Sequence, residues 1–166
     1  MSHGHKQSKP KGFESDMLRV PKIDRTFDIP YVAGYSKDGK TIYIDKDLPE
    51  FFVYKGKKIA IAPFLVVHEA LEKALLDISR MKYEDAHAIA THVENASVSA
   101  AGIPPNVYED FYKPYIKSEA RQVGVVPRDL DLTPYRDEGD TSTLKMIKSA
   151  HASALRKSRG TIAKKQ

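Results

Sequence analysis

One histidine and two glutamates lie close together in a strongly apolar stretch of the chain. His68, Glu69 and Glu72 belong to the segment 64–77, which is otherwise rich in Leu, Val and Ala and follows Pro63. Proline is tolerated in the first turn of a helix, so this segment is predicted to be helical. Apolar residues surround the helix on all sides, which indicates burial. A buried His and Glu must be paired, hydrogen-bonded or bound to a metal, because an uncompensated buried carboxylate costs several kcal/mol.

The spacing is that of the H-E-x-x-H zinc motif with a glutamate in place of the second histidine. On a helix, His68 and Glu72 point the same way and Glu69 lies about 100° around the cylinder. In H-E-x-x-H, the two side chains four residues apart hold Zn²⁺, and the glutamate between them accepts a proton from the metal-bound water. A carboxylate ligand favours harder metals. The motif predicts a site for Zn²⁺ or another divalent metal, with His68 and Glu72 as ligands and Glu69 as general base.

The segment 83–101 offers three candidates for the remaining ligands, namely His87, His92 and Glu94. It contains neither Gly nor Pro, is rich in alanine and ends at Gly102, so it is predicted to be a second helix. His87 and Glu94 are seven residues apart and share a face. His92 lies about 140° from His87, so the two histidines cannot both face one metal from a straight helix. The shared face favours His87 with Glu94, and His92 is the alternative.

These residues resemble the zincin-like metallopeptidases, which include domains encoded by phages and mobile elements. The likeness covers residues 40–100, where a strand over 41–49 precedes an apolar helix that carries Val67-His68-Glu69-x-x-Glu72. In the gluzincin branch a glutamate ligand follows on the next helix, and His92 stands in the corresponding place. The resemblance implies a metal-dependent peptidase that acts on a peptide or protein. It also implies an edge strand over the cleft, where a substrate peptide would add to the sheet near Ile42, Tyr43 and Ile44.

The chain before the first helix carries the signals of two β-hairpins. Asp38-Gly39 separates two runs of β-branched and aromatic residues, 32–36 and 41–45, and Gly56 stands between two further runs, 51–54 and 58–61. Two hairpins, or one small antiparallel sheet, are therefore expected before the helices. Because the connection 79–82 is short, the two helices after the sheet should pack as antiparallel neighbours.

The later part of the chain is predicted to be helical with one long loop. A third helix is expected over 107–123, with a kink or break at Pro114. The acidic segment 129–140 is predicted to be a loop, and Thr141 or Ser142 could cap a last helix. The expected fold is α+β, with a small antiparallel sheet followed by a three- to four-helix segment. We divide the chain into a flexible N-terminus (1–12), a single zincin-like domain (13–140) and a basic helix or tail (141–166).

Composition narrows the class of protein. The chain of 166 residues is long enough for a core, and it contains no cysteine, which excludes disulfides and thiolate metal ligands. No apolar run approaches the roughly 20 residues that a membrane span needs, so we expect a cytoplasmic protein without membrane partners. The net charge is +5, but residues 141–166 carry seven Lys/Arg and no acid, which leaves −2 for residues 1–140.

Two classes of function follow from these observations. The first is a metal-dependent hydrolase with its His/Glu site between two helices. The alternative is a non-catalytic structural or binding module, in which the His/Glu cluster is a buried polar network and the basic tail makes weak contact with nucleic acid. Metal content distinguishes the two classes.

Overall fold

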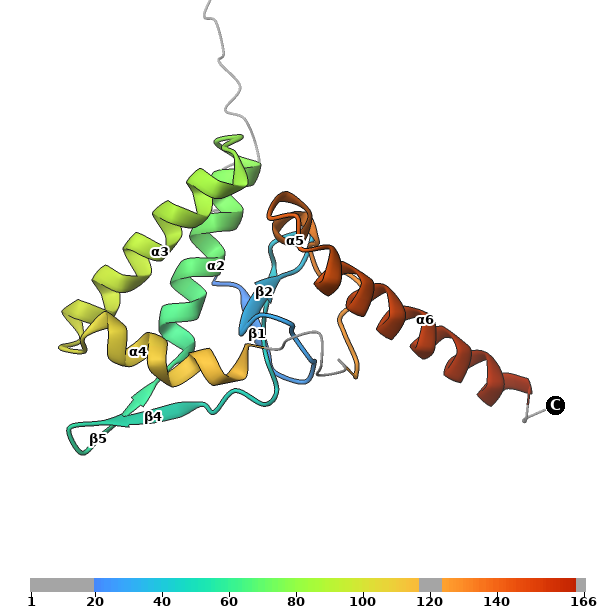
Figure 1. Ribbon diagram of the computed structural model, residues 1–166, viewed down its shortest axis with the longest axis horizontal. Helices are drawn as coiled ribbons and strands as arrows, with labels where there is room; N and C mark the ends of the chain where they lie inside the picture. Colours follow the sequence, from blue (N-terminus) through green and yellow to red (C-terminus); the bar gives the residue numbers. More distant parts are fainter. Residues whose placement is uncertain (1–19, 117–123, 164–166) are drawn as a thin grey trace, which may run out of the picture.

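The computed structural model describes residues 20–116 and 124–163, and the side chains of the last helix as far as Lys157. Strands precede helices in this part of the chain (Figure 1), which confirms the α+β class. The strands are β1 (Lys22–Asp24), β2 (Ala33–Tyr35), β3 (Thr41–Ile44), β4 (Phe51–Tyr54) and β5 (Lys57–Ala60). The helices are α2 (Ala62–Asp77), α3 (Tyr83–Ala100), α4 (Pro105–Tyr112), the 3-10 turn η1 (Lys113–Tyr115), α5 (Thr133–Asp137) and α6 (Thr141–Ala163). No described helix has both the length and the apolarity that crossing a membrane requires. The predicted flexible segment 1–12 lies outside the described residues.

Three strands form a mixed sheet in the order β1-β3-β2. β2 and β3 are an antiparallel hairpin, as the Asp38-Gly39 signal predicted. Gly39 has a φ of 67°, a left-handed conformation that glycine adopts without strain. β1 pairs with β3 in parallel, a pairing that no local sequence signal indicated.

β3 is the central strand of this sheet and not an edge strand. Ile42, Tyr43 and Ile44 are 1%, 5% and 0% exposed, and β3 is hydrogen-bonded to a strand on each side. The prediction that a substrate peptide adds to the sheet at these three residues is therefore wrong. Their β-branched and aromatic side chains indicate a strand, but the order of strands depends on the distant β1, which occupies the edge that the peptide would need.

β4 and β5 form a separate antiparallel hairpin, as predicted. Lys55 and Gly56 have φ values of 48° and 74°, which suits the two-residue turn that matches the twist of the strands. Phe52 of β4 stacks on Phe111 of α4, with ring centroids 4.9 Å apart. This contact fastens the hairpin to the helices.

α2 and α3 lie side by side as an antiparallel pair (Figure 1). Pro63 lies in the first turn of α2, as predicted. Ala86 and Ala90 of α3 are fully buried, which is consistent with the close approach expected of small side chains. The prediction that α2 is buried on every side is wrong, because Ala70 is exposed and Ile78 at its end is 63% exposed.

The third helix is shorter than predicted. α4 ends at Tyr112, and Pro114 lies in the 3-10 turn that follows, as expected where a proline breaks a helix. Residues 117–123 of the predicted helix lie outside the described residues. Tyr108 of α4 is buried against Phe64 of α2, with ring centroids 5.4 Å apart. α4 therefore closes one end of the helix pair.

The segment 129–140 contains the short helix α5 and is not wholly a loop. Asp131 Oδ1 accepts a hydrogen bond from the backbone N–H of Thr133 at 2.9 Å, where the helix begins. Asp131 Oδ2 lies 2.9 Å from Nζ of Lys73, a buried lysine of α2. This ion pair joins α5 to α2, so acidic residues that suggested a loop instead fix a short helix against the body.

The cap of α6 is Asp140 and not Thr141 or Ser142. Asp140 Oδ1 accepts hydrogen bonds from the backbone N–H of Thr143 at 2.9 Å and from the hydroxyl of Ser142 at 2.8 Å. An aspartate at this position also suits the positive end of the helix dipole.

α6 begins within the body and then projects away from it (Figure 1). Ile147 is 0% exposed and packs with Ala150 in a core cluster that includes Ile29 and Tyr135. The first turns of α6 therefore share a core with residues before 141, and the predicted boundary at residue 141 cuts through that core.

Candidate metal centre

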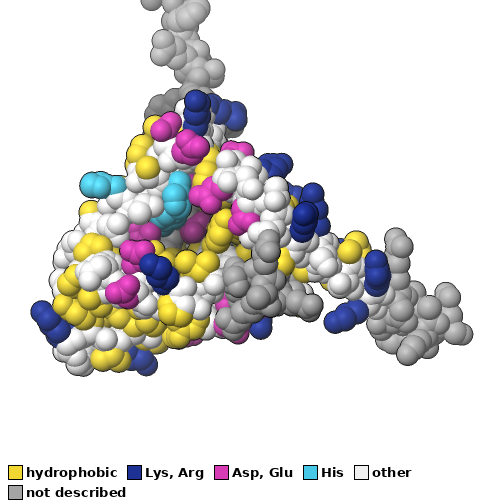
Figure 2. Space-filling model, viewed as in Figure 1, with side chains coloured by type: hydrophobic (Ala, Val, Ile, Leu, Met, Phe, Trp, Pro, Cys, Tyr) yellow, Lys and Arg dark blue, Asp and Glu magenta, His cyan; other side chains and the backbone are white. Residues whose placement is uncertain are grey.

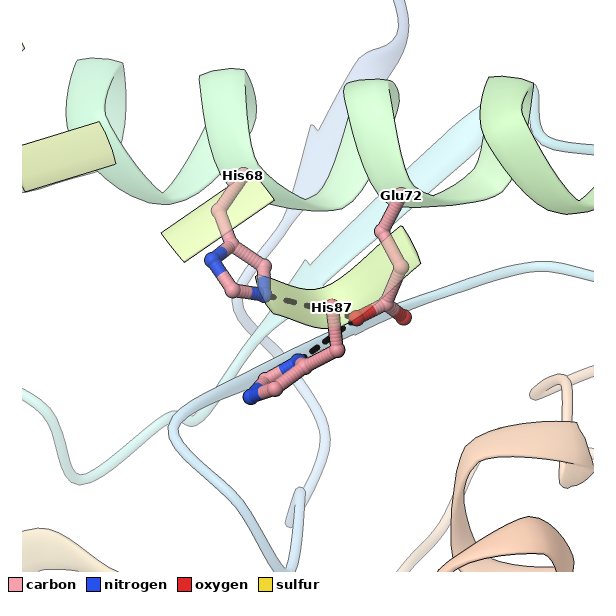
Figure 3. A group of neighbouring side chains, drawn as sticks. All are labelled: His68, Glu72 and His87. Carbon is pink, nitrogen blue, oxygen red and sulfur yellow. Dashed lines mark hydrogen bonds and ion pairs between the residues drawn. The ribbon is translucent and has the colours of Figure 1, made fainter. Parts of the chain in front are cut away.

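His68, Glu72 and His87 converge between α2 and α3 (Figure 3). Each offers one ligand atom, and these three atoms lie within 4.8 Å of one another. His68 and Glu72 are one helical turn apart on α2, and both are buried. The structure thus brings together the two predicted ligands of the motif and His87, the favoured candidate on the second helix.

Glu72 is at the centre of this group. Its Oε2 lies 3.5 Å from Nε2 of His68 and 2.7 Å from Nδ1 of His87 (Figure 3). Its Oε1 accepts a hydrogen bond from the hydroxyl of Tyr35 on β2 at 2.8 Å. Burial opposes the charged carboxylate, but the hydrogen bonds from His68, His87 and Tyr35 outweigh it and lower the pKa of Glu72 to about 2. Glu72 is therefore an anion, the form in which a carboxylate binds a metal.

Glu94 stands behind His68 and is not one of the converging ligands. Its Oε2 lies 2.9 Å from Nδ1 of His68, and its Oε1 accepts a hydrogen bond from the Tyr108 hydroxyl at 2.6 Å. Burial opposes the charged imidazolium of His68, but hydrogen bonds to Glu72 and Glu94 prevail and raise its pKa to about 10. Because Glu94 engages Nδ1, Nε2 is the nitrogen that faces Glu72. Glu94 therefore orients the His68 ring, whereas the sequence suggested that Glu94 could itself be a ligand.

His92 does not reach the centre. It is exposed on α3, whereas Glu94, two residues later, is buried. A separation of five residues turns His92 about 140° from His87, as the helix geometry indicated. The alternative in which His92 is a ligand is wrong, because its side chain lies on the outer face of α3.

Glu69 lies beside the three converging residues and faces the same cavity. Burial raises the pKa of Glu69 to about 8, although the positive charge of His68 acts in the opposite direction. No hydrogen bond links its carboxyl group to another described residue, so it is available to a molecule in the cavity. Its position next to His68 is the one predicted for a general base.

Three tyrosines that no sequence motif indicated complete the site. Besides the hydroxyls of Tyr35 and Tyr108, the hydroxyl of Tyr83 lies 3.3 Å from Nδ1 of His87, and the two rings stack with centroids 5.4 Å apart. The i, i+4 spacing of Tyr83 and His87 was a signal of contact on one helix. Tyr35 and Tyr108 come from β2 and α4, so no local pattern connects them to the site.

A cavity of about 240 Å³ opens over this group. Its walls come from β2, α2, α3, the end of α4 and the segment around α5. Figure 2 shows the hollow with acidic and histidine side chains around it. The candidate centre is therefore accessible to a small molecule or to a side chain of a larger one.

The three residue types match a zinc site, and a metal would displace the proton that His68 carries in the metal-free protein, where its pKa is about 10. Two imidazoles and one carboxylate are a known catalytic zinc set. With metal–ligand bonds of about 2.0–2.1 Å, the ligand atoms of a tetrahedral site lie about 3.3 Å apart. The 3.5 Å between His68 and Glu72 is close to this value, and the 2.7 Å between His87 and Glu72 is a hydrogen bond that a metal would replace. Glu94 supplies the carboxylate that commonly supports a metal-bound histidine.

Comparisons with protein-family models, with curated proteins and with solved structures give no match for this chain. The resemblance to zincin-like metallopeptidases therefore remains a prediction from the H-E-x-x-E motif.

Proposed function

We propose that this protein is a metal-dependent hydrolase that holds Zn²⁺ with His68, Glu72 and His87 and acts on a peptide or protein. The observation that carries the proposal is the convergence of three ligand atoms within 4.8 Å, from two helices, at the wall of a cavity. Surface acids often cluster without a metal, but here Glu72 and His68 are buried and each is held by a further side chain.

The residues around the three ligands have separable roles in this proposal. A bound zinc ion would supply Lewis acidity, which polarises a carbonyl group and makes water a stronger acid. Glu69 would take up and release the proton, since its carboxyl lines the cavity beside the three ligands and makes no hydrogen bond to another described residue. Glu94 would keep the His68 ring oriented, and Tyr83 would support His87 by stacking. The substrate would enter through the cavity, because β3 offers no free edge.

Metal content of the purified protein tests the proposal. We expect about one zinc ion per chain by elemental analysis when the protein is purified without chelator or nickel affinity resin. His68→Ala, Glu72→Ala and His87→Ala should each remove it. His92→Ala is the matched control, because it deletes an exposed histidine of α3, and it should retain the metal. A wild-type protein that takes up no divalent metal would refute the proposal.

A second candidate function has its own supporting observation. The far half of α6 projects from the body (Figure 1), and Lys145, Lys148 and Arg156 are exposed on this helix. No acidic residue occurs between 141 and 166. Such a helix would make weak, salt-dependent contacts with nucleic-acid phosphates. In this candidate, the His/Glu group is a buried polar network with no metal and no catalytic role.

A further inference from the structure

The cavity over the candidate centre is lined by acidic and aromatic side chains. Among the described residues, no lysine or arginine lines it. The acidic residues are Glu69, Glu72, Glu94, Asp131 and Glu138, and the tyrosines are Tyr31, Tyr35, Tyr83, Tyr112 and Tyr135. Two histidines, His68 and His87, also line the cavity, but the five carboxyl groups outnumber them. A cavity with this lining favours a positively charged occupant and repels an acidic one.

The acidic residues differ in the hydrogen bonds and ion pairs that their carboxylates already make. Glu72 and Glu94 bind the histidines and tyrosines of the centre, and Asp131 is paired with Lys73. Glu138, which follows α5, is exposed at the cavity wall. Its carboxylate accepts one hydrogen bond from a described residue, the Tyr31 hydroxyl, at a long 3.4 Å. That hydroxyl makes a shorter bond of 2.8 Å to Asp140, so Glu138 remains able to pair with a ligand.

An aromatic pair lies next to Glu138. The rings of Tyr31 and Tyr135 stack with centroids 4.8 Å apart and planes 20° apart. Aromatic rings beside a carboxylate are a setting in which ammonium and guanidinium groups bind, because the ring faces and the carboxylate both attract the cation. Glu138, Tyr31 and Tyr135 all line the cavity that contains the candidate metal ligands.

We propose that this cavity accepts a lysine or arginine side chain of the substrate peptide, with its charge beside Glu138 and the tyrosine pair. This inference rests on the proposed hydrolase function and names its substrate class. The charge of the whole chain does not explain such a preference, because the net charge of +5 repels cations. A preference for a basic peptide would therefore come from the cavity itself.

Binding of short peptides tests the inference without reference to catalysis. The probe is fluorescein-labelled Ala-Ala-Lys-Ala-Ala amide, compared with the same peptide carrying norleucine, which has nearly the shape of lysine without the charge, or glutamate. Fluorescence polarisation is measured on the full-length protein after treatment with EDTA, which prevents metal-dependent turnover, and again after zinc is added. We expect the lysine peptide to bind about tenfold more tightly than the norleucine peptide, a difference of about 1.4 kcal/mol.

Glu138→Gln should remove most of that preference, because it deletes the charge and keeps the shape. Glu50→Gln is the matched control, since Glu50 is exposed and does not line the cavity, and it should keep the preference. Equal binding of the lysine and norleucine peptides, or an unchanged preference in Glu138→Gln, would overturn the inference.

The two proposals fail in different ways. If the protein prefers the lysine peptide but holds no zinc and hydrolyses nothing, the hydrolase proposal fails and the binding site for a basic side chain stands. If it holds zinc and cleaves peptides without regard to charge, the inference about substrate class fails alone.

Discussion

The Glu94 carboxylate and the His68 imidazole are 26 residues apart in the sequence and only 2.9 Å apart in the structure. The bond joins α3 to α2 in the buried layer between them. Glu94 contacts Nδ1 of His68, so Nε2 of the same ring faces Glu72. Histidines that bind metals commonly have a carboxylate on their other ring nitrogen, as His68 does here.

Glu94→Gln should weaken zinc binding and preserve the fold. The amide is nearly isosteric with the carboxylate and can still accept the hydrogen bond from Tyr108, but it orients His68 less firmly. The expected loss is about 10- to 100-fold in zinc affinity, as for other residues that support a metal-bound histidine. A competition titration against a chelating dye measures it. Glu84→Gln, an exposed change in the first turn of α3, is the control, and equal affinity in the two variants would contradict this role.

Glu69→Gln should keep the bound zinc and abolish hydrolysis. The substitution removes the proton acceptor without changing the volume of the side chain, and Glu69 is not one of the three converging ligands. A loss of about 10²- to 10⁴-fold in kcat is expected for a general base. Turnover of a peptide substrate and zinc content are measured on the same preparation. A Glu69→Gln protein with full activity would disprove the assignment of Glu69 as the base.

Zinc should raise the stability of the metal-free protein. At a free zinc concentration of 100 times Kd, the gain is about 2.7 kcal/mol. Glu72→Ala should abolish the gain, which thermal unfolding with and without zinc would reveal. If the His/Glu group is only a polar network, zinc gives no shift, yet Glu72→Ala still costs about 1–3 kcal/mol because Tyr35 and His87 lose their buried partner. A protein with neither effect would contradict both candidate functions.

Local sequence signals predicted both hairpins and the helix pair α2 and α3. The two glycine turns indicated both hairpins. The apolar segment after Pro63 and the alanine-rich segment before Gly102 predicted α2 and α3 to within two residues at each end. The four-residue spacing placed His68 beside Glu72. Helical periodicity also placed His87 and Glu94 on the face opposite to His92.

The features that the sequence did not reveal depend on contacts between distant segments. β1 pairs with β3 across some twenty residues and so moves Ile42, Tyr43 and Ile44 to the middle of the sheet. The buried Lys73 is explained only by Asp131, 58 residues later. The roles of Glu94 also required the structure, because a carboxylate on the correct face can either bind the metal or support a ligand.

Asp140 should stabilise the start of α6 in a pH-dependent way. Burial opposes its charge, but hydrogen bonds from Thr143, Tyr31 and Ser142 prevail and lower the pKa of Asp140 to about 2 from an ordinary value of 3.8. Because the folded state favours the ionised form, the stabilisation is complete above the ordinary pKa and is lost as the pH falls toward 2.

Asp140→Ala should therefore cost about 0.5–2 kcal/mol at neutral pH, and the difference from the wild type should shrink between pH 4 and pH 2. Urea unfolding at several pH values measures the difference. Asp137→Ala, an exposed change at the end of α5, should have little effect at any pH. A cost for Asp140→Ala that is the same at pH 2 and pH 7 would contradict a role for the charge.

Two truncations should separate the structural part of α6 from its basic end. Removing residues 141–166 takes Ile147 out of the core, and we expect a large fall in melting temperature, since Ile147→Ala alone should cost about 2–5 kcal/mol. Removing residues 152–166 should leave the melting temperature nearly unchanged, because the deleted part starts at the exposed residues Ala152 and Ser153.

The shorter truncation also tests the nucleic-acid candidate. It deletes five of the seven Lys/Arg of the segment 141–166, so binding to a DNA duplex at low salt should weaken and become less dependent on salt. Arg156→Gln within the full chain is a milder control that should reduce binding in the same direction by a smaller amount. If DNA binding is the same with and without residues 152–166, the basic end of α6 is not a nucleic-acid contact. Zinc content and peptide hydrolysis should be unaffected, because no described residue of α6 lines the cavity.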